Sequence, residues 1–517
     1  MKSLWMLLTL LTLAPSLLVA AERPPNVILI LADDLGAQEL SCYGSQEHST
    51  PHLDQMAAEG VRFETFFAMP LCTPTRVCLM TGRYGFRSGY LGMANQAFIP
   101  LKDSPQRDIA NHFTLADLVK TRGYATAQVG KWQLSGELPT LVRDCGFDEY
   151  CMWAYDHNLP AGVTHPAHER RGGATCRYWH PSLIQNGEYR PTEPNDYGPD
   201  IFNEFAIDFA RRHKDEPFFI YYTSVLTHGP QLETPDPEHP GERWPAGFKS
   251  CLEYLDVLMG RLNAGLKEAG LDQNTYVMFV GDNGTGGDGK GTVTELGARV
   301  PCIITGPGIE KGLVSRAVGD LTDFIPTLAA ISGAKLPQDV VFDGHSLLPV
   351  LQGKQERHRD WIYSHLDDGR VLRDERWLLE LAKGGQGERF FDCGTSRDGT
   401  GYKDVTDSQD PEVKAARAKF AEILSKIPEP KPHPGMGAGD GNAKAKSSGK
   451  GKKKPDDPNL ARFEMRDRNH DGIIDRQEFF ETMSSKTQAA GEARLKKLDT
   501  NRDGQVSREE FISNSQK

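Results

Sequence analysis

The sequence predicts an α/β protein built on a doubly wound, mostly parallel sheet, with a smaller α+β subdomain toward the C-terminus. Short apolar segments alternate with amphipathic ones, as strands and helices do in such sheets. Polar residues follow these apolar segments, at the sheet edge where ligands bind in this fold class. We assign strands to residues 27–31, 125–130, 217–225 and 275–280, and helices to residues 50–59, 114–121, 201–213 and 248–266.

The first strand ends in two acids. Residues 27–31, V-I-L-I-L, form a continuous apolar run, as expected of a parallel strand covered on both faces. Asp33 and Asp34 follow, and two adjacent carboxylates repel each other unless a cation or a helix start compensates them. A helix N-cap accounts for one aspartate but not for both.

The other strands end in residues of the same kind. Lys131 follows residues 125–130, His228 follows residues 217–225, and Asp282 with Asn283 follows residues 275–280. A lone histidine is more often structural than catalytic, and Asp-Asn-Gly alone is a common turn. Their shared position at strand ends favours a functional interpretation.

Length and composition indicate a soluble protein of several parts. The 517 residues exceed one ordinary core, and 38% hydrophobic with 25% charged residues is typical of a soluble chain. The net charge of −11 gives no support for nucleic-acid binding, which usually requires a basic excess.

The first residues resemble a secretory signal peptide. Lys2 precedes an apolar run over residues 4–19, and Val19-Ala20-Ala21 fits a cleavage site. A retained anchor is the alternative, although the run is short for a membrane span. We predict a signal peptide at residues 1–21, a secreted or periplasmic protein, and no transmembrane span in the mature chain.

The most informative stretch is residues 70–83, P-L-C-T-P-T-R-V-C-L-M-T-G-R, in which proline and arginine stand two and four residues after Cys72. It closely resembles the signature of the type I sulfatases, members of the alkaline-phosphatase-like superfamily. The resemblance implies that a formylglycine-generating maturation enzyme oxidises Cys72 to formylglycine, whose hydrate attacks sulfur. A buried structural cysteine beside a proline turn is the alternative. Eight other cysteines could form disulfides or remain buried thiols.

The resemblance extends over about residues 25–353 and implies roles for the residues at the strand ends. Asp33, Asp34, Asp282 and Asn283, with the converted Cys72, would bind an active-site calcium ion. Arg76 would fix the formylglycine hydrate, Lys131 and Lys290 would bind sulfate, and His228 would protonate the leaving group. One position departs from the family: Gln133 stands where the family has histidine.

The implied function is hydrolysis of sulfate monoesters, with a sulfated glycan or an aryl sulfate as substrate. A phosphonate or phosphodiester hydrolase of the same superfamily can also use formylglycine, so it stays an alternative. A non-catalytic sulfate-binding protein is another. We expect the catalytic domain to span residues 22–355, and a long insertion at residues 138–199 to shape the substrate pocket.

The C-terminal third contains three further parts. We expect the smaller subdomain at residues 356–427, a flexible Pro-, Gly- and Lys-rich linker at residues 428–458, and an α-helical EF-hand pair at residues 459–517. Each predicted loop offers calcium ligands at positions 1, 3, 5, 7, 9 and 12. They are Asp467, Asn469, Asp471, Ile473, Asp475 and Glu478 in the first loop, and Asp499, Asn501, Asp503, Gln505, Ser507 and Glu510 in the second.

Overall fold

The computed structural model forms two compact units, residues 1–439 and 440–517. It describes residues 23–92, 109–134, 141–154, 159–163, 165, 175–385 and 387–428, and in the second unit 473–474, 495, 499–501, 503, 505–507 and 510. The predicted signal peptide and almost all of the predicted linker lie outside the described residues. No helix in the described ranges is long and apolar enough to cross a membrane.

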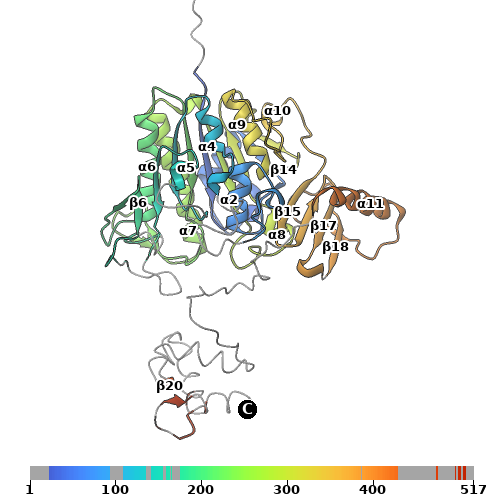
Figure 1. Ribbon diagram of the computed structural model, residues 1–517. Coiled ribbons are helices and arrows are strands. Elements are labelled where there is room, and N and C mark those ends of the chain that lie inside the picture. The colour runs from blue at the N-terminus through green and yellow to red at the C-terminus, as the bar shows by residue number, and fades with distance from the viewer. Residues whose placement is uncertain are drawn as a thin grey trace, which may run out of the picture. The chain divides into compact units, whose positions relative to one another are not determined.

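A ten-stranded mixed sheet is the centre of the first unit (Figure 1), in the order β13-β2-β12-β11-β1-β8-β4-β5-β6-β7. Its five central strands, β11, β1, β8, β4 and β5, are mutually parallel, which confirms the predicted fold class. The strands are β1 (Asn26–Ala32), β2 (Val61–Phe63), β4 (Ala125–Gly130), β5 (Glu149–Trp153), β6 (Leu183–Gln185), β7 (Glu188–Arg190), β8 (Phe218–Thr223), β11 (Thr275–Gly281), β12 (Cys302–Thr305) and β13 (Leu313–Ser315).

Helices cover both faces of this sheet. Side chains of β1 alternate between two cores: Val27 and Leu29 belong to one, Ile28 and Ile30 to the other. The first core is closed by α2 (Cys72–Thr81), α4 (Leu115–Lys120) and α9 (Phe324–Ser332). The second is closed by α1 (Pro51–Glu59), α6 (Gly198–Arg212) and α7 (Phe248–Glu268).

The C-terminal part of this unit is a five-stranded antiparallel sheet with one helix beside it (Figure 1). Its elements are β15 (Ile362–Leu366), β16 (Gly369–Arg373), β17 (Trp377–Leu381), β18 (Glu388–Asp392), β19 (Lys403–Asp404) and α11 (Pro411–Lys426). Asp410 caps α11 by accepting a hydrogen bond from the Glu412 N–H, and Phe420 packs edge-on against Phe390 of β18.

Shorter elements complete the first unit. They are the helices α3 (Gly85–Ser88), α5 (Leu141–Asp144), α8 (Glu295–Ala298) and α10 (Leu348–Leu351), and the strand pairs β3 (Phe66–Phe67) with β14 (Gly319–Asp320) and β9 (Thr234–Pro235) with β10 (Arg243–Trp244). The nine cysteines form no disulfide in the described parts of the chain.

Among its few described residues, the second unit contains one short antiparallel pair, β20 (Ile473–Ile474) with β21 (Val506–Ser507). Ile473 is opposite Ser507, and the Val506 side chain is fully buried. This pair joins the two predicted calcium loops at the positions where EF-hand loops carry an apolar residue.

Candidate active site

The carboxyl ends of four parallel strands bring the predicted site residues together. β1, β4, β8 and β11 run in the same direction, with Leu31 in register with both Val280 and Thr223. Asp33 and Asp34 therefore leave the sheet beside Asp282 on one side and beside the turn that carries His228 on the other. Parallel pairing thus explains why Asp34 and Asp282, which are 248 positions apart, meet.

The acidic residues form one buried cluster. Asp33, Asp282 and Asn283 are fully buried, and Asp34 is 4% exposed. The Asp34 N–H donates to Oδ1 of Asp282 over 2.8 Å, and Nδ2 of Asn283 donates to Oδ1 of Asp34 over 3.0 Å. Asp34 has a left-handed backbone (φ 60°), which turns the chain directly after β1.

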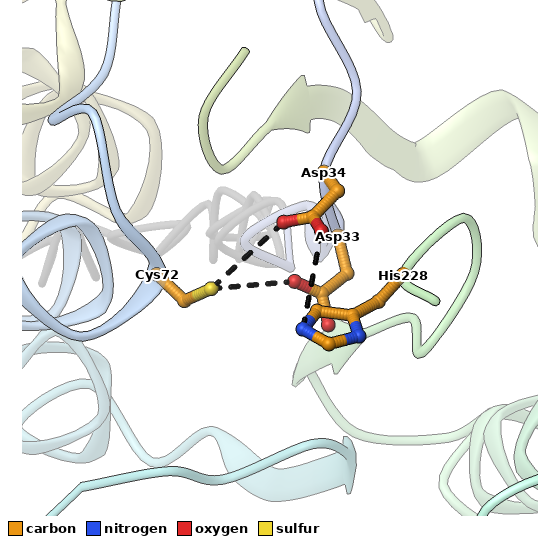
Figure 2. Close-up of side chains that lie close together, drawn as sticks. All are labelled: Asp33, Asp34, Cys72 and His228. Carbon is orange, nitrogen blue, oxygen red and sulfur yellow. Dashed lines mark hydrogen bonds and ion pairs between the residues drawn. The ribbon is translucent and has the colours of Figure 1, made fainter. Parts of the chain in front are cut away.

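Cys72 is the first residue of α2 and points at this cluster (Figure 2). Its Sγ lies 3.6 Å from Oδ1 of Asp33 and 4.0 Å from Oδ1 of Asp34. Helix N-termini carry partial positive charge, which favours an anionic group at this position. Burial raises the pKa of the Cys72 thiol to about 12, so the unmodified side chain is protonated at neutral pH and is a poor nucleophile.

Three basic side chains compensate the acids. The Arg76 guanidinium donates to the Lys131 carbonyl over 2.9 Å and to Oδ2 of Asp282 over 3.1 Å. The Lys131 ammonium binds both carboxylate oxygens of Asp33, at 3.0 and 2.7 Å. Lys290 lies 2.6 Å from the Asp34 carboxylate, and its side chain is 21% exposed.

These contacts shift the pKa values of Asp33 and Asp282 in opposite directions. Burial opposes ionisation of Asp33, but the positive charges of Lys131 and Arg76 hold its pKa well below the usual value. Burial, together with the charge of Asp33, raises the pKa of Asp282 to about 8. Burial and the neighbouring carboxylate thus oppose ionisation of Asp282, which a further cation would favour.

His228 faces the cluster from the turn after β8 (Figure 2). Its Nε2 lies 3.9 Å from Oδ2 of Asp34, and its Nδ1 lies 2.6 Å from the Gly229 carbonyl. Because a carbonyl only accepts, Nδ1 carries the proton of the neutral ring and Nε2 is open toward the site. Burial and the positive charge of Lys131 keep the pKa of His228 well below its usual value.

The acidic cluster fits a calcium ion. Asp33, Asp34, Asp282 and Asn283 offer oxygen atoms, the ligands that calcium prefers. Oδ1 of Asn283 is buried and meets no hydrogen-bond donor among the described residues, as expected of an oxygen that awaits a cation. Ligand atoms of Asp33, Asp34, Cys72 and His228 all lie within 4.8 Å of one another.

Two features of the site were not assigned from sequence. The Tyr178 hydroxyl, from the predicted insertion, contacts the carbonyls of Val225 (3.1 Å) and His228, and so anchors the His228 turn. Thr75 donates to the Asp282 carbonyl over 2.6 Å. Thr75 lies inside the recognised motif, but nothing in the sequence around Tyr178 indicated its contact.

Gln133 stands two residues after Lys131 in a left-handed conformation (φ 53°). Its Oε1 is buried and receives no hydrogen bond from the residues that the structure describes. The amide has no titratable proton, so this position contributes no acid or base.

The second EF-hand loop is closed around one carboxylate. Glu510 accepts hydrogen bonds from the backbone N–H groups of Thr500 (3.0 Å), Asn501 (3.0 Å) and Ser507 (3.1 Å). Asp503 donates its N–H to Oδ1 of Asp499 over 3.2 Å. The predicted ligands Asp467, Asn469, Asp471, Asp475 and Glu478 of the first loop lie outside the described residues; Ile473 is described through its strand pairing, and Gln505 is exposed.

Comparisons with known proteins agree with this geometry. The Sulfatase family model matches residues 25–334, and the EF-hand domain pair model matches residues 459–515. Human arylsulfatase A is 34% identical over 422 residues, covering 76% of this chain and 79% of the relative. N-acetylgalactosamine-6-sulfatase from Canis lupus familiaris is 32% identical over 388 residues, covering 69% and 72%.

A solved sulfatase structure from Pseudoalteromonas sp. has the same fold. The two superpose with a TM-score of 0.62 at 22% identity, covering 79% of this chain and 92% of the other. The sheet, the buried site and the relatives lead to one conclusion: the chain belongs to the sulfatase family of the alkaline-phosphatase-like superfamily, is a sulfuric ester hydrolase, and carries an EF-hand pair at its C-terminus.

Proposed function

We propose that this chain is an exported sulfatase that acts through a formylglycine derived from Cys72 and an active-site calcium ion. The observation that carries the proposal is the position of Cys72: its side chain lies 3.6 and 4.0 Å from the carboxylates of Asp33 and Asp34. The buried thiol itself is a poor nucleophile, which supports its conversion by a formylglycine-generating enzyme. Once converted, the side chain at position 72 would supply, as a hydrated formylglycine, one hydroxyl to attack sulfur and a second to expel sulfate.

The acids would hold the ion. Asp33, Asp34, Asp282 and Asn283 would bind calcium through oxygen, together with the converted side chain at position 72. Bound calcium lowers the pKa of a coordinated hydroxyl and offsets the charge of the sulfate oxygens.

The basic residues would bind and orient the substrate. Arg76 is fixed between the Lys131 carbonyl and Asp282, so its guanidinium is held beside the side chain at position 72. Lys131 and Lys290 bring two ammonium groups to the same edge of the sheet, where they would contact sulfate oxygens as negative charge develops. Lys290 is the more accessible of the two.

His228 would protonate the leaving oxygen. The ring is neutral in the substrate-free site because burial and Lys131 lower its pKa. A bound sulfate ester brings negative charge next to Nε2, which raises the pKa and allows that nitrogen to take up a proton. The imidazolium then delivers it to the departing alcohol.

The matched pair Cys72→Ala and Cys78→Ala tests the proposal, since both cysteines lie on α2 and are buried. Co-expression with a formylglycine-generating enzyme should lower the intact mass of the wild-type chain by about the mass of one water molecule. Cys72→Ala should lose about 10⁴-fold or more in kcat/KM for a nitrophenyl sulfate. Cys78→Ala should be converted and stay active.

Other outcomes would favour the alternatives. An unmodified Cys72 together with tight sulfate binding would indicate a non-catalytic sulfate-binding protein. Preference for nitrophenyl phosphonate over nitrophenyl sulfate would indicate a phosphonate hydrolase.

For the substrate, we propose a sulfated glycan or an aryl sulfate. The names of the relatives point to both classes: arylsulfatase A and N-acetylgalactosamine-6-sulfatase. Hydrolysis of sulfated oligosaccharides beside nitrophenyl sulfate separates them, because a chain that cleaves only the aryl ester has no glycan subsites.

We further propose the domain limits 22–355, 356–427, 428–458 and 459–517, with a signal peptide removed after Ala21. The C-terminal pair would bind two calcium ions through the loop residues named above. Amino-terminal sequencing of the exported protein tests the cleavage site, and calorimetric titration with calcium tests the loops.

A further inference from the structure

The segment between β11 and β12 supplies three residues of the site: Asp282 and Asn283 at its start and Lys290 in its middle. Hydrogen bonds fix this middle part on the side of the catalytic turn. The Gly291 N–H donates over 2.8 Å to the carbonyl of Pro70, which lies two residues before Cys72. The Lys290 N–H donates to the Thr285 carbonyl over 3.1 Å.

The opposite side of this segment packs on the C-terminal antiparallel sheet. Val293 is 9% exposed and belongs to a small core that includes Leu366, Val371 and Leu378 of β15, β16 and β17. The approach is close: a Cβ added to Gly369 would lie 2.8 Å from Cγ2 of Val293. The segment is therefore held between the catalytic turn and the C-terminal sheet.

Two charged residues of that sheet contact Glu295, which lies two residues after Val293 at the start of α8. The Glu295 N–H donates to Oε1 of Glu380 over 2.8 Å, and its carboxylate lies 3.2 Å from Nη1 of Arg373. Arg373 is fully buried and also donates to the Ser396 carbonyl over 3.0 Å and to Sγ of Cys393 at 2.9 Å. A buried ion pair with several fixed partners tolerates little displacement.

We propose that Arg373 and Glu380 are positioning residues for the sulfatase reaction, which act through Glu295 to hold the Lys290 backbone in place. The inference rests on the proposed contact of Lys290 with sulfate. A lysine side chain has four rotatable bonds, so the place of its ammonium depends on a fixed backbone. A displacement of about 1 Å at a reacting site can cost about 10²-fold in rate.

The first test compares Glu380→Gln with Glu380→Met. Glutamine keeps an oxygen that can accept from the Glu295 N–H, whereas methionine has similar length and no such acceptor. In the full-length, formylglycine-containing enzyme, we expect Glu380→Met to raise KM for nitrophenyl sulfate and the inhibition constant of inorganic sulfate by about tenfold, with a smaller change in kcat. Glu380→Gln should stay within about twofold of wild type.

The second test repeats the pair in a Lys290→Met background. If Glu380 acts through Lys290, Glu380→Met should add less than about twofold once the lysine is gone. An undiminished tenfold effect in that background, or equal losses with Glu380→Gln, would overturn the inference. Wild-type kinetics for Lys290→Met alone would instead contradict the proposed role of Lys290.

A third variant covers the case in which Glu380→Met does not fold. Gly369→Ala keeps both charged residues and displaces Val293, so it should give the same rise in KM that disappears with Lys290→Met. Unchanged KM in a folded Gly369→Ala protein would count against the inference.

Discussion

Two buried clusters of charged residues flank α2, and they differ in how far their polar groups are paired. The active-site cluster lies at the start of the helix, where Cys72 faces Asp33 and Asp34. The second, which we call the Arg359 cluster, lies beyond its end and comprises Tyr84, Asp320, Asp323 and Arg359. The acidic residues of both clusters are almost completely excluded from solvent.

The charged groups of the Arg359 cluster are paired with one another and with neighbouring residues. Arg359 lies 2.8 Å from Asp320 and 3.1 Å from Asp323, and the Tyr84 hydroxyl donates to Asp320 over 2.5 Å. Asp320 and Asp323 also form a capping box. In the active-site cluster, an oxygen of Asn283 instead has no donor from the described residues, and the pKa of Asp282 is raised by burial and by the charge of Asp33. A closed cluster supports the fold, whereas an incomplete one is suited to bind a ligand.

The largest effect expected on activity comes from Asp282→Asn. The change removes a proposed calcium ligand charge, and we expect kcat/KM to fall by about 10³-fold or more. The melting temperature of the metal-free protein should change less than in Arg359→Met, because the repulsion between Asp282 and Asp33 that is relieved offsets the weakened contact with Arg76. A large loss of stability with retained activity would indicate that the active-site cluster supports the fold and not ligand binding.

Arg359→Met should show the opposite pattern. It removes the guanidinium that contacts both buried carboxylates and leaves His358, 3.1 Å from Asp323, as a basic neighbour of one of them. We therefore expect a loss of about 3–5 kcal/mol in the free energy of unfolding. Activity per folded molecule should stay within about threefold of wild type, measured by kinetics after denaturant unfolding has given the folded fraction. Loss of turnover in the folded protein would show that this cluster is not merely structural.

His365 gives the same region a pH dependence. Its Nε2 accepts from the Gly85 N–H over 3.2 Å, and burial lowers its pKa to about 4. The unfolded chain, with a histidine pKa of about 6.5, takes up the proton first, so stability falls as the pH drops from about 6.5 to about 4, by about 3 kcal/mol. Thermal unfolding across that range tests this, and His365→Gln should flatten the curve.

Gln133→His should produce the smallest change and acts on the open cluster. A histidine adds a titratable group where the family has one, and its backbone tolerates a left-handed conformation. We expect kcat to rise by about tenfold, with a new pH limb near 6.5. An unchanged kcat and pH profile would indicate that this position does not contact the reacting groups.

The sequence was most informative where chemistry follows strands. Asp33, Lys131, His228 and Asp282 could be placed on one edge because parallel strands end together, and the structure brings them there. The mixed edge of the sheet, with β12 antiparallel to β11, was not predicted, because apolar runs do not encode strand direction.

Contacts between distant segments were the least predictable. Tyr178 under the His228 turn and Arg373 against Glu295 depend on tertiary packing that no local pattern marks. The Arg359 cluster was missed for the same reason, since its members lie in three separate segments, each ordinary by itself.

Because Cys72 is in the first turn of α2, the helix fixes the distance and direction from Cys72 to Arg76. Four residues in a helix correspond to slightly more than one turn and about 6 Å of rise, so Cys72 and Arg76 share a face. One inserted residue between them would swing the guanidinium by about 100° away from the cysteine. Chain length between those two residues, as much as their identity, therefore fixes the chemistry available to the enzyme.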